Sequence, residues 1–349
     1  MECRQRHGDG ASAISGTRHG MLGLLGVLAV AAMSACALLA TAAQASTVTV
    51  GSVLPTGSVA TEFKQVRTFF NAALPEKGAN LTSPVTGAIV RWRMQDPAGG
   101  PFALRVLRPN GTGGYMAAGT SNPVTPAAGG GLQTFTTLLP VQAGDLIGVD
   151  PTNATDKIGI ATVPGASFGF IFPPPFDGST VAPSGGFPGE EVELSAEVQP
   201  APAITSITPD FGSVVGGTSV KITGTNLGGA SAVKFGDVPA TSFKAETETQ
   251  ITAIAPASVK VGSVDVTATS LAGTSPTVKN DLFFYEGCVV PKLKGKKVKA
   301  AKKALGRADC KVGKITRRKG KPGKVLKQNP KAGKVLAPRT KVKLTVGKS

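Results

Sequence analysis

The sequence predicts a mainly-β, multidomain protein that ends in a small α+β unit. Glycine and proline are abundant, with 45 and 26 of the 349 residues. They separate short runs in which apolar and polar residues alternate, which is typical of strands joined by turns. A stiff Pro-containing segment, 199–202, divides two such regions. The basic charge is concentrated at one end, because residues 288–349 hold 22 Lys and Arg against one acid, a formal charge of +21.

Residues 1–45 are predicted to be a secretory signal peptide. Three arginines precede an almost purely apolar run, 21–42, which ends in the small-x-small sequence Ala43-Gln44-Ala45. An uncleaved anchor is the alternative, because the run approaches the length that spans a bilayer. Lipidation at Cys36 is a second alternative. We expect a secreted, extracellular protein with no membrane span after cleavage of the signal.

The residues absent from the predicted mature chain exclude several kinds of chemistry. Both histidines, His7 and His19, lie in the predicted signal peptide. Ser-His-Asp and Cys-His catalysis are therefore excluded, together with the commonest zinc ligand. We expect no enzyme activity, no cofactor and no metal site. The sequence leaves the oligomeric state open.

Residues 46–199 are predicted to form the first domain, a β-sandwich of jelly-roll type. Seven stretches alternate like half-buried strands: 47–53, 87–94, 102–107, 133–138, 146–149, 157–161 and 192–198. Turn clusters rich in Gly, Pro, Asn and Asp separate them. The strand–turn–strand segment 139–149 is similar to one found in extracellular jelly rolls and in uncharacterised secreted actinobacterial proteins.

Two groups of residues in this domain could carry a ligand site. Trp92 alternates with Val90 and Met94 on one strand face, which favours the core over a sugar-binding platform. Four aspartates could supply calcium ligands, although they are scattered in turns, where Asp is common for backbone reasons. These are Asp145, Asp150, Asp156 and Asp177.

Three acids near the end of the domain could supply the two catalytic carboxyl groups of a glycosidase. Glu190 and Glu191 are adjacent, and Glu193 follows two residues later. Neighbouring carboxylates on a strand point to opposite faces, so we expect a solvated edge rather than a catalytic pair.

Residues 200–287 are predicted to be a second, smaller sandwich. The segments 204–209, 216–227, 233–236, 251–256 and 264–268 carry its landmarks. They resemble an IPT/TIG domain, which implies an immunoglobulin-like fold acting as a spacer or interaction module. Val220 and Ile222 alternate inward. Leu227 departs from the family, which prefers an aromatic residue there.

Residues 288–349 are predicted to be one helix on a three-stranded sheet. Val298, Ala301 and Leu305 fall at helical spacing within 297–308. Three extended stretches follow, at 311–316, 323–328 and 340–346. In the last, valine and leucine alternate with lysine and threonine.

This pattern resembles a PASTA domain. The most specific element is Gln328-Asn329-Pro330-Lys331-Ala332-Gly333, with Val290-Pro291 at the start and Gly323-Lys324-Val325 between. The resemblance implies binding to peptidoglycan or muropeptides. Arg339 stands where the family usually has Gly, and the lysine content is extreme.

Cys288 and Cys310 are predicted to form a disulfide, because a lone pair of cysteines in an exported protein is most simply explained that way. A loop of about 21 residues would stabilise the unit by roughly 3 kcal/mol.

The concentrated charge favours a polyanion as the partner of residues 288–349, namely peptidoglycan or an anionic cell-wall polymer. An intracellular nucleic acid is not expected. The candidate binding residues are Lys297, Lys299, Lys302, Lys303, Arg317, Arg318, Lys319, Lys324, Lys327 and Lys331. The resulting hypothesis is a non-enzymatic protein associated with the cell wall. The alternatives are an extracellular polysaccharide-active enzyme with its site in the first sandwich, and an adhesin that binds polyanions.

Overall fold

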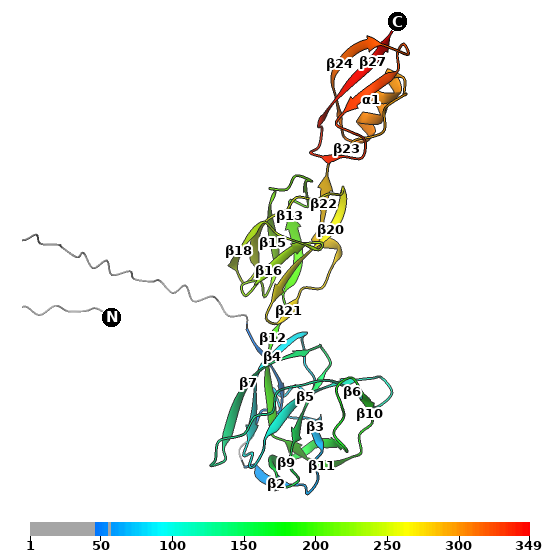
Figure 1. Ribbon diagram of the computed structural model, residues 1–349. Helices are drawn as coiled ribbons and strands as arrows, with labels where there is room; N and C mark the ends of the chain where they lie inside the picture. Colours follow the sequence, from blue (N-terminus) through cyan, green and yellow to red (C-terminus); the bar gives the residue numbers. More distant parts are fainter. Residues whose placement is uncertain (1–45, 55–56) are drawn as a thin grey trace, which may run out of the picture. The chain divides into compact units, whose positions relative to one another are not determined.

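The computed structural model describes residues 46–54 and 57–349. The predicted signal peptide, 1–45, lies outside the described residues, and with it Cys36 and both histidines. Strands are the main regular element of the described residues, with one α-helix and one short 3-10 helix among them (Figure 1). The prediction of a mainly-β, multidomain fold is confirmed. No helix in the described ranges has the length and apolar character needed to cross a membrane.

The first unit is a sandwich of two antiparallel sheets. The smaller sheet has the order β1-β12-β4-β7, and its strands are β1 (Val48–Gly51), β12 (Leu194–Pro200), β4 (Gly87–Gln95) and β7 (Leu132–Val141). The larger sheet has the order β10-β6-β5-β8-β3-β9-β11, with β2 paired to β9. Its strands are β2 (Val59–Glu62), β3 (Thr68–Ala73), β5 (Phe102–Pro109), β6 (Tyr115–Thr120), β8 (Leu146–Pro151), β9 (Lys157–Ile171), β10 (Thr180–Val181) and β11 (Gly185–Val192).

Trp92 lies in the core between these sheets, as predicted, and is fully buried. Its ring centroid lies 4.6 Å from that of Phe135. The prediction that Val90 shares the core-facing side of the strand with Trp92 is wrong, because the pairing of β4 with β7 shifts register between Ile89 and Arg91. This bulge places Ile89 in the core and leaves Val90 only half-buried.

Strand β3 shows why alternation did not reveal every strand. Its residues Thr68 to Asn71 are all buried. Phe69 packs in the main core, and Phe70 packs on the other side of the sheet in a second cluster with Leu107 and Leu146. A strand covered on both faces has no polar face to alternate with.

The second unit also contains two sheets, in agreement with an immunoglobulin-like fold. One has the order β13-β15-β19-β18, from β13 (Ala203–Thr208), β15 (Ser219–Thr225), β19 (Gln250–Ile254) and β18 (Ser242–Thr247). The other has the order β14-β22-β20-β16-β17, with β21 paired to β20. Its strands are β14 (Phe211–Ser213), β16 (Ala232–Phe235), β17 (Val238–Pro239), β20 (Gly262–Ser270), β21 (Gly273–Thr274) and β22 (Leu282–Glu286), and η1 (Lys279–Asp281) precedes β22.

The core of this second unit forms as the alternation predicts. Val220 and Ile222 are fully buried, and Leu227 is buried in the same cluster although it replaces an aromatic residue. The hydroxyl of Tyr285 donates a hydrogen bond of 2.9 Å to the carbonyl of Pro256.

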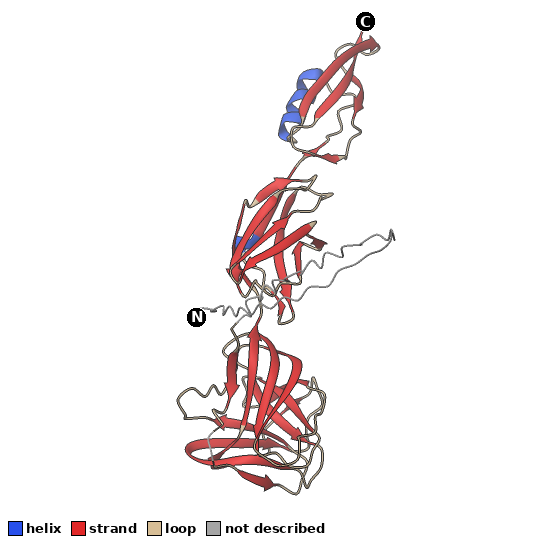
Figure 2. Cartoon of the chain, turned by 90° about the vertical axis from the view of Figure 1, so that its left-hand side faces the viewer, coloured by secondary structure: helices blue, strands red, loops and turns tan. Residues whose placement is uncertain are grey.

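The third unit has the predicted helix on a three-stranded sheet. The helix α1 (Val298–Arg307) precedes β24 (Lys311–Lys319), β25 (Val325–Asn329) and β27 (Lys341–Lys348), in the sheet order β24-β27-β25. The same unit also contains a small ladder of β23 (Cys288–Val289) and β26 (Val335–Leu336). The predicted disulfide between Cys288 and Cys310 is present, with a Cα–Cα distance of 4.8 Å. Figure 2 shows the helix against one side of the strands.

Candidate functional site

The third unit carries a basic surface on the side of its sheet that faces away from α1. We call this surface the open sheet face. It encloses a surface depression of about 710 Å³. Six cationic side chains line the depression: Lys314, Arg318, Lys319, Lys327, Lys331 and Lys343. Hydroxyl and amide groups of Thr316, Thr345 and Asn329 lie among them.

The open sheet face exists because β27 alternates strictly. Val342, Leu344 and Val346 are buried in the cluster that includes the helix residues Ala301 and Leu305. Successive strand residues point to opposite faces, so the residues between these three point away from the helix. The helix therefore buries every apolar side chain of the strand, and the lysines between them stay exposed.

The register places groups from all three strands in one row. Thr316 of β24 and Lys327 of β25 both pair with Thr345 of β27. The Thr316 and Thr345 hydroxyl oxygens lie 3.3 Å apart. Opposite residues in neighbouring strands point to the same face, so the row crosses the whole sheet.

A bulge in β24 brings a further lysine to this surface. The register with β27 shifts between Val312 and Ile315. Gly313 lies so close to β27 that a Cβ there would come within 3.0 Å of the carbonyl carbon of Val342. Glycine permits this approach, and Lys314, next to it, lines the depression.

No carboxylate compensates these charges. The residues that line the depression include no Asp or Glu. Among the residues that the structure describes, no Lys or Arg of 288–349 forms an ion pair, since all ion pairs lie between residues 91 and 246. Like charges held together in this way attract anions and repel one another when no anion is bound.

Gln328 holds the start of this unit to the sheet. Its side-chain oxygen accepts a hydrogen bond of 2.7 Å from the backbone N–H of Leu293. Its amide nitrogen donates one of 2.9 Å to the carbonyl of Pro291. The conspicuous Gln-Asn-Pro sequence thus has a structural role beside the basic surface.

Comparison with known proteins identifies the second and third units. A family model of the IPT/TIG domain matches residues 202–285, and a model of the PASTA domain matches residues 289–348. The chain carries an IPT/TIG domain followed by a PASTA domain.

No curated protein matches the chain. Among solved structures, it is similar to the full extracellular region of plexin A4, at 12% identity and a TM-score of 0.23. That alignment covers 68% of this chain and 34% of the plexin chain.

The ten basic residues predicted from the sequence fall on two sides of the PASTA domain. Four line the depression, namely Arg318, Lys319, Lys327 and Lys331, and Lys319 does so from the end of β24, since its register with Lys348 places it on the same side of the strand as Arg317. The other six lie elsewhere on the domain and are exposed: Lys297, Lys299, Lys302, Lys303, Arg317 and Lys324. Arg317 pairs in register with Val346, a residue buried against the helix, so it points to the helix side of the sheet.

Sequence reasoning missed Lys314 and Lys343, which complete the open sheet face of the PASTA domain. A signal for Lys343 was present, because it alternates with the apolar residues of its strand. No comparable signal existed for Lys314, because the bulge at Gly313 interrupts the alternation.

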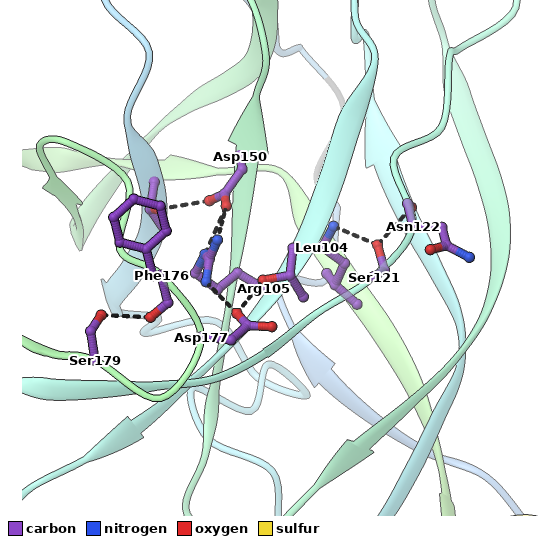
Figure 3. Close-up of polar contacts among 10 residues, drawn as sticks. Leu104, Arg105, Ser121, Asn122, Asp150, Phe176, Asp177 and Ser179 are labelled. Carbon is purple, nitrogen blue, oxygen red and sulfur yellow. Dashed lines mark hydrogen bonds and ion pairs between the residues drawn. The ribbon is translucent and has the colours of Figure 1, made fainter.

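The first unit contains a buried ion pair that secures an exposed loop (Figure 3). Arg105 is 5% exposed and bonds to Asp150 at 2.6 Å and to Asp177 at 2.9 Å. The hydroxyl of Thr68 donates to Asp150 at 2.6 Å. Asp177 follows Phe176, whose side chain is 86% exposed. The network holds this aromatic residue at the surface on an anchored loop.

The four aspartates considered as calcium ligands have other partners. Asp150 and Asp177 bind Arg105, and Asp145 binds Arg108 at 2.8 Å. Asp156 accepts backbone N–H groups, including that of Gly100 at 2.7 Å. Within the described ranges no three acidic, histidine or cysteine side chains come together as a metal site.

The expectation of a solvated edge at Glu191 and Glu193 is wrong. Their side chains lie on the same side of the chain and are 0% and 1% exposed. Glu191 accepts a hydrogen bond of 2.6 Å from Ser52. Burial raises the pKa of Glu191 to about 7, and the neighbouring Glu76 adds to this effect. Burial likewise raises the pKa of Glu193 to about 7, with a contribution from the charge of Asp96. Both carboxyls alternate along the chain with Val192 and Leu194, which pack in the core, and are buried beside Ser52 and Asp96 instead.

Proposed function

We propose that the protein is a secreted, non-enzymatic component of the cell surface, held to the cell wall by its PASTA domain. PASTA domains are known for binding peptidoglycan or β-lactams, and IPT/TIG domains for serving as immunoglobulin-like spacers. The partner proposed for this PASTA domain is peptidoglycan or an anionic wall polymer. The observation that carries the proposal is the uncompensated positive charge of the open sheet face.

The roles of the other units follow from what they lack and what they expose. The IPT/TIG domain would act as a spacer or interaction module. The first sandwich would present a ligand surface outside the wall. The buried acids Glu191 and Glu193 are unsuited to catalysis on a polysaccharide, because a substrate cannot reach side chains that are 0% and 1% exposed.

Co-sedimentation of the full-length secreted chain with purified cell wall tests the proposal. At low salt the chain is expected to sediment with the wall, and rising salt should release it because the attraction is electrostatic. A chain that ends before residue 288 is the matched control and should stay in solution. Equal sedimentation of the two chains, or none at low salt, would refute anchoring by the PASTA domain.

A further inference from the structure

Charge alone does not decide where an anion binds on the PASTA domain. The helix α1 also carries exposed lysines, among them Lys299, Lys302 and Lys303. These project from the exposed side of the helix. The cations of the open sheet face instead line one depression, so that a single chain of anions can contact several of them together.

The strands set a regular spacing on that face. Side chains two residues apart on a strand lie roughly 6–7 Å apart, and neighbouring strands lie about 4.8 Å apart. Thr316 and Arg318 follow this spacing along β24, as do Lys343 and Thr345 along β27. Cationic and hydroxyl donors therefore repeat across the face with the period of the sheet.

The residues of the face do not suit a sugar ring, a nucleobase or a compact ligand. Residues 288–349 contain no Phe, Trp, Tyr or His, so neither sugars nor bases can stack. Leu326 and Leu344 are the only apolar residues that line the depression, and the side chain of Leu344 is buried on the helix side of the sheet. Sites for small molecules are mostly apolar with a few polar groups, which is the reverse of this composition.

We propose that the open sheet face binds a flexible polymer of polyol phosphodiesters, with successive phosphates seated on its cations. Each phosphodiester carries one full charge and two free oxygens, which accept hydrogen bonds from lysine, from the fork of Arg318 and from the threonine hydroxyls. A flexible chain can follow the periodic donors without a shaped pocket. The inference rests on the proposed function and names the wall component that the domain recognises.

The test measures affinity of the full-length secreted chain for a synthetic oligo(glycerol phosphate) over a range of salt concentrations. The variant K314Q/R318Q/K343Q removes three cations from the open sheet face. The matched control K299Q/K302Q/K303Q removes three from the helix. Far-UV circular dichroism checks that both variants are folded.

The sheet-face variant is expected to bind about 100- to 200-fold more weakly near 0.1 M salt, as loss of three contacts to an anionic surface implies. Its plot of log affinity against log salt should be shallower by about 2, since each neutralised phosphate contributes about 0.7. The helix variant should change less than about 3-fold. An equal loss in both variants would overturn the placement on the sheet face.

Two further probes fix the chemistry of the ligand. Poly-L-glutamate and oligo(dT), matched in charge to the oligo(glycerol phosphate), are expected to bind more weakly. Equal affinity for poly-L-glutamate would overturn the preference for phosphate, and equal affinity for oligo(dT) would overturn the polyol backbone.

Cell wall stripped of its phosphate polymers separates this inference from the proposed function. Unchanged sedimentation with stripped wall would overturn the inference and leave wall anchoring standing, whereas no sedimentation with either wall would refute the anchoring itself.

Discussion

The two buried glutamates of the first sandwich should make its stability fall as the pH rises. In the folded chain the pKa of Glu193 is raised from 4.5 to about 7. The folded state therefore holds a proton that the unfolded state releases between these values. The stabilisation is complete below about pH 4.5 and is lost as the pH rises through about 7.

The magnitude follows from the shift. One pKa unit is worth about 1.4 kcal/mol, so Glu193 alone lowers the free energy of unfolding by about 2–3 kcal/mol between pH 5 and pH 8. For a domain of this size that corresponds to roughly 5–10 °C in Tm. Glu191, whose pKa is also raised to about 7, should add a further fall in the same direction.

Fluorescence of Trp92 during thermal unfolding provides a selective assay. It is the only tryptophan in the chain, and it is fully buried in the first sandwich. The variant E193Q, which has no ionisable group at this position, should have a smaller pH dependence than the wild type, and E191Q/E193Q a smaller one still; burial also raises the pKa of Asp150 in this sandwich, so some dependence should remain. The control E62Q alters an exposed acid and should leave it intact. A wild-type Tm that is constant from pH 5 to 8, or an unchanged slope in E191Q/E193Q, would refute the reasoning.

Three further changes test other parts of the structure. Arg105→Met should lower the free energy of unfolding in urea by about 3–5 kcal/mol, because it leaves the buried charge of Asp150 without its partner. It should also speed proteolysis in the loop after β9. A loss of stability below about 1 kcal/mol would contradict this account. Replacing Cys288 and Cys310 by serine should destabilise the PASTA domain by about 3 kcal/mol in denaturation followed by far-UV circular dichroism, and equal stability of the variant would exclude a structural disulfide. Gln328→Ala should lower the free energy of unfolding by about 1–3 kcal/mol and speed amide hydrogen exchange at the N–H of Leu293. Unchanged exchange would show that the two hydrogen bonds of the Gln328 side chain are dispensable.

The sequence alone was enough for the properties that depend on local pattern. Strict alternation in 340–346, helical spacing in 297–308 and the Gln328–Gly333 motif led to the PASTA prediction. Similar landmarks in 204–268 led to the IPT/TIG prediction. The location of the positive charge also required no structure, because composition is independent of folding.

Register and burial were decided only by the tertiary structure. Bulges at Val90 and Gly313 exchanged which residues face the core and which join the open sheet face, because one extra residue inverts the alternation that follows it. Glu191 and Glu193 look solvent-exposed by residue type, yet the fold buries both of them, Glu191 against Ser52. The sequence by itself therefore determined the fold class and the charge of the basic end. Packing against α1 decided which of those charges form one surface, since the helix covers only one face of the sheet.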